Sequence, residues 1–262
     1  MRRASSKRDF IQSDAPYSPC PRYDLLADSI SGQGPNSRHV SVLLAFDIYG
    51  TVVDPRAVAA QLSDIFGERA PLAAQLWRAK QLEFTFRRAL MRRYVDFDVC
   101  TAQALECVSA NLGVRLDAAS RDELLRAYRT LPAFPEVRHS LETLHGSGYR
   151  TVALSNGTLH SIQSLLAHAG LTACFDAVLS ADTIATFKPD PAVYELAVRA
   201  AGIAEPDVCL ISANSFDVIG AKAVGLKAAW VRRGAEVFDP WEYQPDVTVR
   251  DLRELSVTLP RL

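Results

Sequence analysis

The chain contains 262 residues, of which 48% are hydrophobic and 23% charged, and this balance indicates a globular protein with a sizeable core. Its formal net charge is −1, from 29 basic and 30 acidic residues, so it offers no overall positive field to a nucleic acid. No apolar run approaches the roughly 18 residues that cross a bilayer. Length and composition therefore favour one large domain, or one domain with an insert, that acts without nucleic acid or membrane.

Residues 1–39 differ in composition from the rest of the chain. They are rich in Ser, Pro, Gly, Arg and Asp, and they contain no long apolar run. Arg2 and Arg3 are not followed by the apolar segment of about 7–15 residues that a secretory signal needs. We expect a flexible tail that carries no chemistry.

Five cysteines are spread along the chain without a Cys-x-x-Cys pair: Cys20, Cys100, Cys107, Cys174 and Cys209. An odd number at wide spacing argues against both a disulfide framework and a structural zinc site. We expect buried, reduced cysteines, which fits a protein of the cytoplasm.

After the tail, short continuous apolar runs alternate with helical patterns. Such runs, separated by helices, predict the strands of a parallel sheet that is covered on both faces. The expected strands are Val40–Phe46, Thr151–Leu154, Ala177–Leu179, Val208–Ile211 and Ala228–Val231. Helix signals between them include an end at Gly170, an Asp190-Pro191 start, and a start at Asn214 or Ser215 with an end near Gly225.

From about Ala57 to Leu131 the alternation gives way to helical patterns alone, around 57–66, 71–92, 99–112 and 119–129. A stretch of this length after the first strand predicts a helical cap rather than a crossover connection. The fold class we expect is therefore α/β, a doubly wound parallel sheet formed by residues 40–56 and 132–262, with a helical cap inserted at 57–131.

Polar residues follow four of the expected strands. Because ligands bind at the carboxyl ends of the strands in such sheets, we expect these residues to converge on one edge. They are Asp47, Ser155, Asn156, Lys188, Ser212, Asn214 and Asp217. Each residue alone also has a structural interpretation, but their joint placement points to a functional site.

The chemistry of these residues leaves two interpretations open at each position. Asp47 ends an apolar run, where a carboxylate either caps a turn or acts as a nucleophile. Lys188 near it would keep Asp47 ionised, or would lie at the surface. The segment Ser155-Asn156-Gly157-Thr158 forms an anion site at a helix start, or caps that helix. Asp217 in a first helical turn also suits the helix dipole.

In order and spacing, these residues resemble the four motifs of the haloacid dehalogenase superfamily over about residues 42–255. The first motif is Asp47-Ile48-Tyr49-Gly50-Thr51, and the second centres on Ser155-Asn156-Gly157. The third is Lys188-Pro189-Asp190-Pro191 with Tyr194, and the fourth is Ser212-Ala213-Asn214-Ser215-Phe216-Asp217 followed by Gly220-Ala221. Four motifs in this order are far more specific than any one of them.

Two positions separate the chain from the magnesium-dependent phosphatases of that superfamily. Those enzymes carry a second Asp, the general acid, where this chain has Tyr49, and an Asp that helps to hold magnesium where it has Ala213. An alanine side chain offers no oxygen to a hard cation. A halide leaving group needs neither the acid nor the metal. The combination resembles the L-2-haloacid dehalogenases (type II).

The cap region is similar to the same family. Its segment Leu76-Trp77-Arg78-Ala79-Lys80-Gln81-Leu82-Glu83 resembles the helix that presents an arginine to the site, and Arg93-Tyr94-Val95-Asp96-Phe97 resembles the segment whose Phe lines the pocket. Family members usually have Gln in place of Ala79, Trp in place of Phe216 and Ser in place of Ala213. We therefore expect activity, but the substrate preference stays open.

The resemblance implies a two-step hydrolysis of a 2-haloalkanoate. Asp47 attacks the halogen-bearing carbon with inversion, Arg78 and Asn156 bind the departing halide, and Ser155 binds the substrate carboxylate. Asp217 and Asn214 orient the water that cleaves the ester. Thr51, Lys188 and Ser212 would hold the carboxylates in place, while Tyr49, Leu82, Phe97 and Phe216 exclude water. Tyr194 either hydrogen-bonds near Lys188 or Asp217, or packs on its helix.

The resemblance further implies no metal, no cofactor and a homodimer. Three alternatives remain. A phosphatase or phosphonate hydrolase would share the fold, with Lys80 as a conceivable Schiff base, although both depend on magnesium and meet Ala213. A non-catalytic binding protein would be expected to have lost a polar group at the strand ends. A dehalogenase for an unusual substrate such as fluoroacetate fits the same chemistry.

Overall fold

The computed structural model describes residues 42–202 and 207–259, so the expected tail at 1–39 and Cys20 lie outside the described residues. Cys100, Cys174 and Cys209 are buried, as expected, whereas Cys107 is only half-buried, and all four are free thiols. No helix in the described part of the chain has the length and apolar character needed to cross a membrane.

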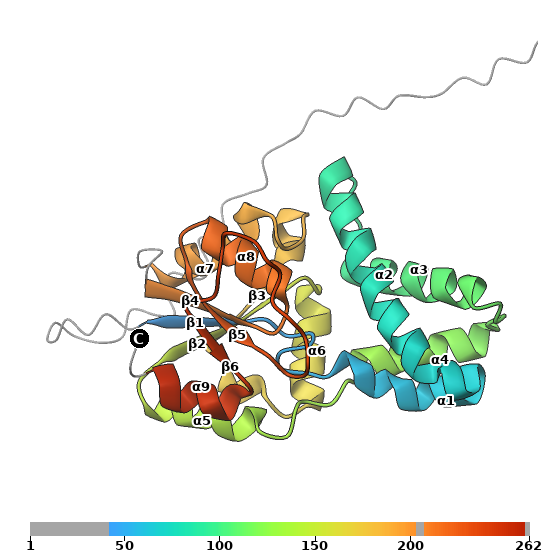
Figure 1. The fold of residues 1–262 in the computed structure, drawn as a ribbon, viewed down its shortest axis with the longest axis horizontal. Helices are drawn as coiled ribbons and strands as arrows, with labels where there is room; N and C mark the ends of the chain where they lie inside the picture. Colours follow the sequence, from blue (N-terminus) through green and yellow to red (C-terminus); the bar gives the residue numbers. More distant parts are fainter. Residues whose placement is uncertain (1–41, 203–206, 260–262) are drawn as a thin grey trace, which may run out of the picture. The chain divides into compact units, whose positions relative to one another are not determined.

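Six parallel strands form a single sheet in the order β3-β2-β1-β4-β5-β6 (Figure 1). Their bounds are β1 Leu43–Phe46, β2 Arg150–Ser155, β3 Ala177–Ser180, β4 Val208–Ser212, β5 Lys227–Val231 and β6 Val247–Val249. The five expected strands are confirmed to within a few residues, except that Val40 and Ser41 of the first one lie outside the described residues. The sixth was not predicted, because its three residues are too short an apolar run to read as a strand. The order in which the chain adds strands reverses at β1, which pairs with β2 on one side and β4 on the other.

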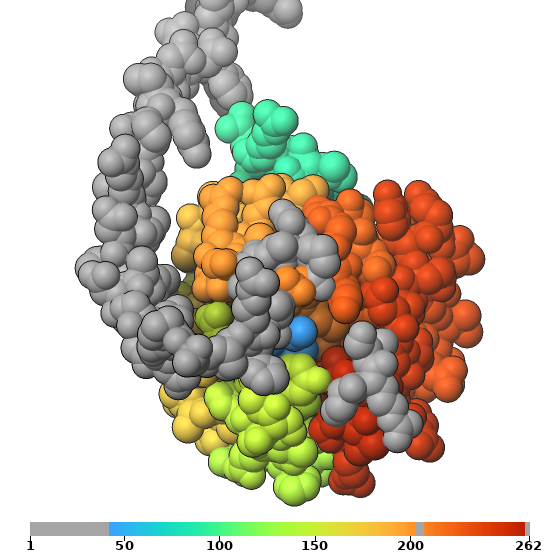
Figure 2. All heavy atoms as spheres, turned by 90° about the vertical axis from the view of Figure 1, so that its left-hand side faces the viewer, coloured from blue at the N-terminus to red at the C-terminus, as the bar shows by residue number. Residues whose placement is uncertain are grey.

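Helices cover both faces of the sheet, because successive side chains of a strand point to opposite faces. Leu44 and Phe46 of β1 pack in one apolar cluster with α5 (Val137–Gly146), α6 (Leu159–His168) and α9 (Leu252–Thr258). Figure 2 shows α5 and the segment around α9 side by side on the surface. Leu43 and Ala45 pack in a second cluster with α7 (Pro191–Ala201) and α8 (Ser215–Ala223). Short 3-10 helices lie at Thr172–Cys174 and Ala181–Ile184.

Residues 55–129 contain helices and no strand. They are a 3-10 turn at Pro55–Val58, α1 (Ala59–Phe66), a second turn at Gly67–Arg69, α2 (Ala70–Met91), α3 (Phe97–Asn111) and α4 (Ala118–Arg129). Figure 1 shows these four α-helices grouped together. The first apolar cluster continues into them through Leu62, Trp77, Leu105 and Leu124.

Helix ends follow local capping. The α3 helix begins at Phe97, two residues before the expected start, because Asp96 caps it by accepting a hydrogen bond from the Val99 amide. The α7 helix begins as predicted, with Asp190 at the N-cap and Pro191 in the first turn.

The fold class, a doubly wound α/β sheet with inserted helices, is confirmed, whereas the division at residues 57 and 131 stays a prediction.

Candidate active site

The Asp47 carboxylate lies at the carboxyl end of β1 and accepts hydrogen bonds from three side chains. Its Oδ1 is 3.1 Å from Lys188 Nζ, and its Oδ2 is 2.9 Å from Thr51 Oγ1 and 2.8 Å from Asn214 Nδ2. The side chain of Asp47 is only 8% exposed. Three donors in a nearly dry setting stabilise the negative charge and fix the direction of both oxygens.

Lys188 joins two carboxylates that the sequence places 170 residues apart. Its Nζ lies 2.9 Å from Asp217 Oδ2 in addition to the contact with Asp47, and all three side chains are buried. Burial alone would lower the pKa of Lys188, but the two carboxylates outweigh it and raise this pKa. Burial and the nearby Asp47 raise the pKa of Asp217, because one ammonium compensates only one of two buried negative charges.

Tyr194 both packs and hydrogen-bonds, so its two interpretations are compatible. Its ring is fully buried between α7 and α8, and its Oη lies 2.9 Å from Asp217 Oδ1 and 3.1 Å from the Asp217 carbonyl oxygen. Burial, together with the charge of Asp217, raises the pKa of Tyr194 well above its usual value. The phenol therefore stays protonated and acts as a hydrogen-bond donor to Asp217.

Hydrogen bonds connect the loop after β1 to the loop after β4. Thr51 Oγ1 donates to Asp47 and accepts from the backbone amide of Ala213 at 2.8 Å. Asn214 Nδ2 also lies 3.2 Å from the Tyr49 carbonyl oxygen, and Ser212 Oγ accepts from the Asn214 amide at 3.1 Å. The structure thus brings these polar residues together around Asp47, as the strand-end argument predicts.

The last residue of β2 and the residue after it, Ser155 and Asn156, are buried polar groups that do not cap a helix. Thr158, not Ser155 or Asn156, caps α6 by accepting from the Ser161 amide at 3.1 Å. Ser155 Oγ accepts from the Gly157 amide, and Asn156 Oδ1 accepts from the Lys188 amide at 2.8 Å. Among the described residues, Asn156 Nδ2 has no protein acceptor, so it is free to donate to a ligand.

Arg78 reaches the site from α2. Its Nη2 donates to the Tyr49 carbonyl oxygen at 3.0 Å, which is the same oxygen that Asn214 contacts, and its Nη1 donates to Gln81 Oε1 at 2.8 Å. Within the described ranges, no carboxylate lies within ion-pair distance of this guanidinium. A half-buried cation without a counter-charge attracts an anion.

Aromatic rings enclose the site next to Tyr49. The ring centroids of Phe97 and Tyr128 lie 5.2 and 5.9 Å from that of Tyr49, which is itself buried. Burial raises the pKa of Tyr49, so its phenol is a weak acid here. Phe216 packs edge-on against Phe86 of α2, with centroids 5.1 Å apart, and Leu82 lies half-buried one turn beyond Arg78.

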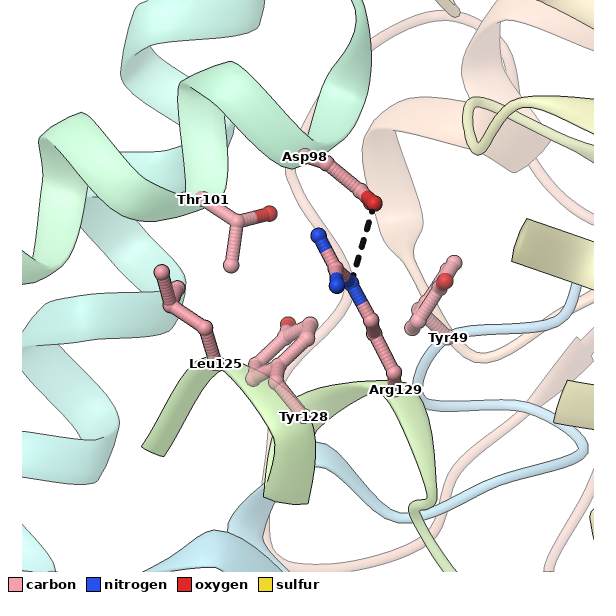
Figure 3. A pocket seen from close by; sticks show the side chains of 6 residues that line it. All are labelled: Tyr49, Asp98, Thr101, Leu125, Tyr128 and Arg129. Carbon is pink, nitrogen blue, oxygen red and sulfur yellow. Dashed lines mark hydrogen bonds and ion pairs between the residues drawn. The ribbon is translucent and has the colours of Figure 1, made fainter. Parts of the chain in front are cut away.

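A small pocket opens beside Tyr49, between α3 and α4 (Figure 3). Its cavity of about 10 Å³ has room for one water molecule. Arg129 reaches toward Asp98, to which it is paired at 3.2 Å, and Ser161 of α6 donates to the same carboxylate. The other lining residues are Thr101, Leu125 and Tyr128.

Arg233 supports the site from behind and was not found from the sequence. Its Nε and Nη2 both donate to the Thr51 carbonyl oxygen, at 3.1 and 2.5 Å, and its Nη1 is 2.8 Å from Glu136. Its guanidinium also lies 3.5 Å from the centroid of the Phe134 ring. No local pattern marks this residue, because its partners lie about 100 and 180 positions earlier.

Two more residues that sequence reasoning missed are Gln81 and Tyr128, both buried. Gln81 lies three residues after Arg78 on α2, and that spacing on one helix face is a signal that could have singled it out. Tyr128 Oη donates to Gln81 Oε1 at 2.8 Å from a different helix, which no sequence spacing reveals.

The fourth strand end lacks one possible metal ligand. Ala213 occupies the position after Ser212, its amide and carbonyl are bonded to Thr51 and Trp230, and its side chain carries no oxygen. Residues 42–202 and 207–259 contain no group of three His, Cys, Asp or Glu side chains placed to hold a metal ion. The arrangement instead offers a fixed nucleophilic carboxylate, an uncompensated cation and a second carboxylate with a raised pKa.

Comparisons with known proteins give a consistent result. A family model described as haloacid dehalogenase-like hydrolase matches residues 42–225. The chain is 40% identical to an (S)-2-haloacid dehalogenase of Pseudomonas sp. (strain YL) over 210 residues, which cover 80% of this chain and 90% of that protein. It is 35% identical to haloacetate dehalogenase H-2 of Moraxella sp. (strain B), over 79% of this chain and 92% of that protein.

A solved structure extends this similarity to three dimensions. The L-2-haloacid dehalogenase from Xanthobacter autotrophicus, with chloropropionic acid covalently bound, superposes with a TM-score of 0.77 at 33% identity. The match covers 84% of this chain and 98% of that one.

Proposed function

Because this chain belongs to the (S)-2-haloacid dehalogenases within the haloacid dehalogenase-like hydrolases, we propose that it hydrolyses the carbon–halogen bond of short (S)-2-haloalkanoates. The products are an (R)-2-hydroxy acid and a halide ion. The observation that carries the proposal is the Asp47 carboxylate, held by Lys188, Thr51 and Asn214, with the uncompensated Arg78 guanidinium bonded to the same loop.

In the first step an Asp47 oxygen attacks carbon 2 of the substrate from the side opposite the halogen. A carbon–oxygen bond forms, the carbon–halogen bond breaks, and the halide leaves with the bonding electron pair. The product is an ester of Asp47 with inverted configuration at carbon 2. Lys188 and Thr51 support this step because their hydrogen bonds orient the carboxylate before substrate binds.

Arg78 and Asn156 stabilise the departing halide. Their roles are supported by the guanidinium that has no counter-charge and by Asn156 Nδ2, whose side-chain oxygen is fixed by the Lys188 amide. The negative charge on the halogen grows toward the transition state, so these donors accelerate the reaction rather than only bind the substrate. Ser155, beside Asn156, would bind the substrate carboxylate.

In the second step a water molecule attacks the carbonyl carbon of the Asp47 ester. Asp217 and Asn214 orient it, and the raised pKa of Asp217 suits a carboxylate that accepts a proton. The acyl carbon–oxygen bond breaks, one proton of the water ends on the hydroxy acid, and the other is released as the Asp47 carboxylate re-forms. Ser212 Oγ accepts a hydrogen bond from the Asn214 amide and so fixes the backbone of Asn214. Tyr194 Oη donates to the Asp217 carboxylate and fixes its orientation.

Phosphate ester hydrolysis fits the same residues less well. Tyr49 stands where a phosphatase has its acid, and burial raises the pKa of this phenol, so it donates a proton poorly to a leaving alkoxide. Ala213 adds no oxygen ligand for magnesium. Lys80, the conceivable Schiff-base lysine, is paired with Glu83 at 2.5 Å.

The test is halide release from each enantiomer of 2-chloropropionate, and from chloroacetate and fluoroacetate, with EDTA present throughout. We expect release from the S enantiomer only, formation of R-lactate, and loss of activity in Asp47→Asn, assayed before deamidation restores Asp. Inhibition by EDTA, or cleavage of a phosphate ester with magnesium in the absence of halide release, would overturn the proposal. Turnover of the haloacetates sets how far the substrate range extends.

We also propose that the protein works as a cytoplasmic homodimer, with residues 57–131 as a cap over a core of residues 40–56 and 132–262. The proposals rest on family membership and on the run of helices between residues 55 and 129. Light scattering after size exclusion measures the mass directly. A mass near the 28.7 kDa of a single chain would contradict the dimer.

A further inference from the structure

Arg78 is fixed by two neutral oxygens rather than by a carboxylate. Its Nη2 donates to the Tyr49 carbonyl oxygen and its Nη1 to Gln81 Oε1, at 3.0 and 2.8 Å. Three other arginines on the cap, Arg87, Arg121 and Arg129, are each paired with a carboxylate instead. Arg78 is thus held in place while its positive charge stays uncompensated.

The Gln81 amide is itself fixed by hydrogen bonds on both sides. Its Oε1 accepts a second hydrogen bond from Tyr128 Oη at 2.8 Å, and its Nε2 lies 2.5 Å from Thr101 Oγ1. Thr101 Oγ1 donates to the Phe97 carbonyl oxygen at 2.8 Å, so toward Gln81 it acts as the acceptor. The amide therefore has one allowed orientation, with its oxygen toward Arg78.

The surroundings make this arrangement rigid. Gln81 is fully buried, Tyr128 is 4% exposed, and the ring of Tyr128 packs on those of Tyr49 and Trp77 with centroids 5.9 and 5.0 Å apart. A buried amide whose oxygen and nitrogen are both hydrogen-bonded is costly to rotate, because the flipped orientation leaves polar groups unpaired. The guanidinium direction is consequently set by the network rather than by Arg78 alone.

We propose that Gln81, assisted by Tyr128, is a positioning residue for the proposed dehalogenation: it aims Arg78 at the departing halide without neutralising it. This inference rests on the proposed function. A carboxylate at position 81 would hold Arg78 more tightly but would cancel the charge that the halide needs. An apolar side chain at position 81 would leave the charge but release the guanidinium.

Two variants of Gln81 test the need for a fixed and for an uncompensated Arg78 separately. We expect Gln81→Glu to lower kcat for (S)-2-chloropropionate about 100-fold, the loss typical of removing one transition-state donor. Gln81→Met should lower kcat about tenfold, since Arg78 keeps its bond to Tyr49. The matched control is Gln103→Glu, because the exposed Gln103 on α3 accepts from Arg88 Nη2 at 2.9 Å in the same way. It should leave kcat unchanged.

The leaving group separates positioning of Arg78 from general damage. Chloride concentrates more charge than iodide and is the poorer leaving group, so it depends more on a cation. The loss in Gln81→Glu should therefore be several-fold larger for chloro- than for iodopropionate. Equal losses for both halogens, in a variant whose melting temperature matches that of Gln103→Glu, would mean that Gln81 only supports the fold and would overturn the proposal.

Bromide binding gives a readout that needs no turnover. Isothermal titration of the full chain with sodium bromide measures it, and the part of the signal that Arg78→Met loses is the part that belongs to Arg78. We expect Gln103→Glu to keep this signal and Gln81→Glu to lose it. If the wild type releases no halide from any 2-haloacid, the proposed function fails. The role of Gln81 in positioning Arg78 is then judged from bromide binding alone. If Gln81→Glu, Gln103→Glu and Arg78→Met all show the same heat of bromide binding, or if the wild type shows none, the proposed role of Gln81 is overturned.

Discussion

Asn214 stands at the N-cap of α8, yet its side chain does not cap the helix: Nδ2 donates to Asp47 Oδ2 at 2.8 Å. A side-chain cap is worth about 0.5–2 kcal/mol of stability, so a site residue here has displaced a local stabilising contact. The amide also reaches the Tyr49 carbonyl oxygen at 3.2 Å. Its two contacts with the Asp47 loop indicate that position 214 serves the site before it serves the helix.

Replacement of Asn214 by Asp keeps the shape of the side chain but adds a negative charge. In Asn214→Asp a second carboxylate faces Asp47 Oδ2, and the repulsion opposes the ionised nucleophile. We expect kcat for (S)-2-chloropropionate to fall at least about tenfold, which is 1.4 kcal/mol in the activation free energy. Steady-state kinetics measures the change, with Asn111→Asp, an exposed position on α3, as the control. An unchanged kcat would rule out a charge-sensitive contact.

Tyr194→Phe removes a donor that lowers the pKa of Asp217, so burial raises this pKa further. If Asp217 must be ionised to orient water, the acidic limb of the kcat profile moves to higher pH. Because the folded-state pKa lies above 3.8, ionising Asp217 costs stability as pH rises through it. The variant is therefore destabilised more at pH 7 than below pH 4.

Measurement of kcat between pH 4 and 8, together with urea unfolding at both ends of that range, tests this expectation. The exposed Tyr243 provides the control variant Tyr243→Phe. A limb that stays in place, or moves to lower pH, contradicts the assignment of Asp217.

Gly220 of α8 allows the close approach of Tyr194. A Cβ added at Gly220 would lie 2.7 Å from Pro189 Cβ and even closer to Tyr194 Oη. Gly220→Ala should therefore push the phenol away from Asp217 and lower the free energy of unfolding by about 1–3 kcal/mol. Gly146→Ala, at the end of α5 with nothing within 4 Å of the added Cβ, should be neutral or slightly stabilising. Urea denaturation of both variants decides. Equal stabilities would show that the contact relaxes without cost.

Arg233 holds the Thr51 carbonyl oxygen and pairs with Glu136, and both side chains of the pair are 9% exposed. Arg233→Met leaves a buried carboxylate without its partner, so we expect a loss of about 3 kcal/mol in unfolding free energy. The neighbouring Arg232 is exposed, and Arg232→Met should change stability by less than about 0.5 kcal/mol. Adding Glu136→Met to Arg233→Met should restore part of the loss. Additive effects of the two substitutions would argue against a coupled pair.

Most of the fold was predictable because the five expected strands are short apolar runs that helices separate along the chain. Val247–Val249 lacked such a run, and its pairing with β5 depends on the preceding irregular segment. The 3-10 turn at Pro55–Val58, before α1, depends on Asp54, whose side chain accepts from the Arg56 amide. That contact is local, but several turn types share it. The sequence pattern around Asp54 therefore does not distinguish a separate 3-10 turn from the first turn of the helix that follows.

The residues around Asp47 were predictable because the topology of a parallel sheet places strand ends together whatever the loop sequences are. The layer behind them was not. Gln81, Tyr128 and Arg233 act through contacts between helices or with a backbone oxygen, and any polar residue looks the same in the sequence whether it makes such a contact or faces solvent. Arg233 was one arginine in a chain with many, and only its burial against Glu136 distinguishes it.

The Tyr49 carbonyl oxygen is bonded to Arg78 of α2 and to Asn214 of α8, so one peptide group links the inserted helices to the core. Any hinge motion of α2 away from the loop must break the bond from Arg78. A hydrogen bond from a charged group contributes about 1.5–3 kcal/mol, so the broken state is roughly 10- to 150-fold less populated on account of this bond. An open form of the protein would keep the hydrogen bonds around Asp47 and lose the anion site, which would re-form when α2 returns and Arg78 bonds to Tyr49 again.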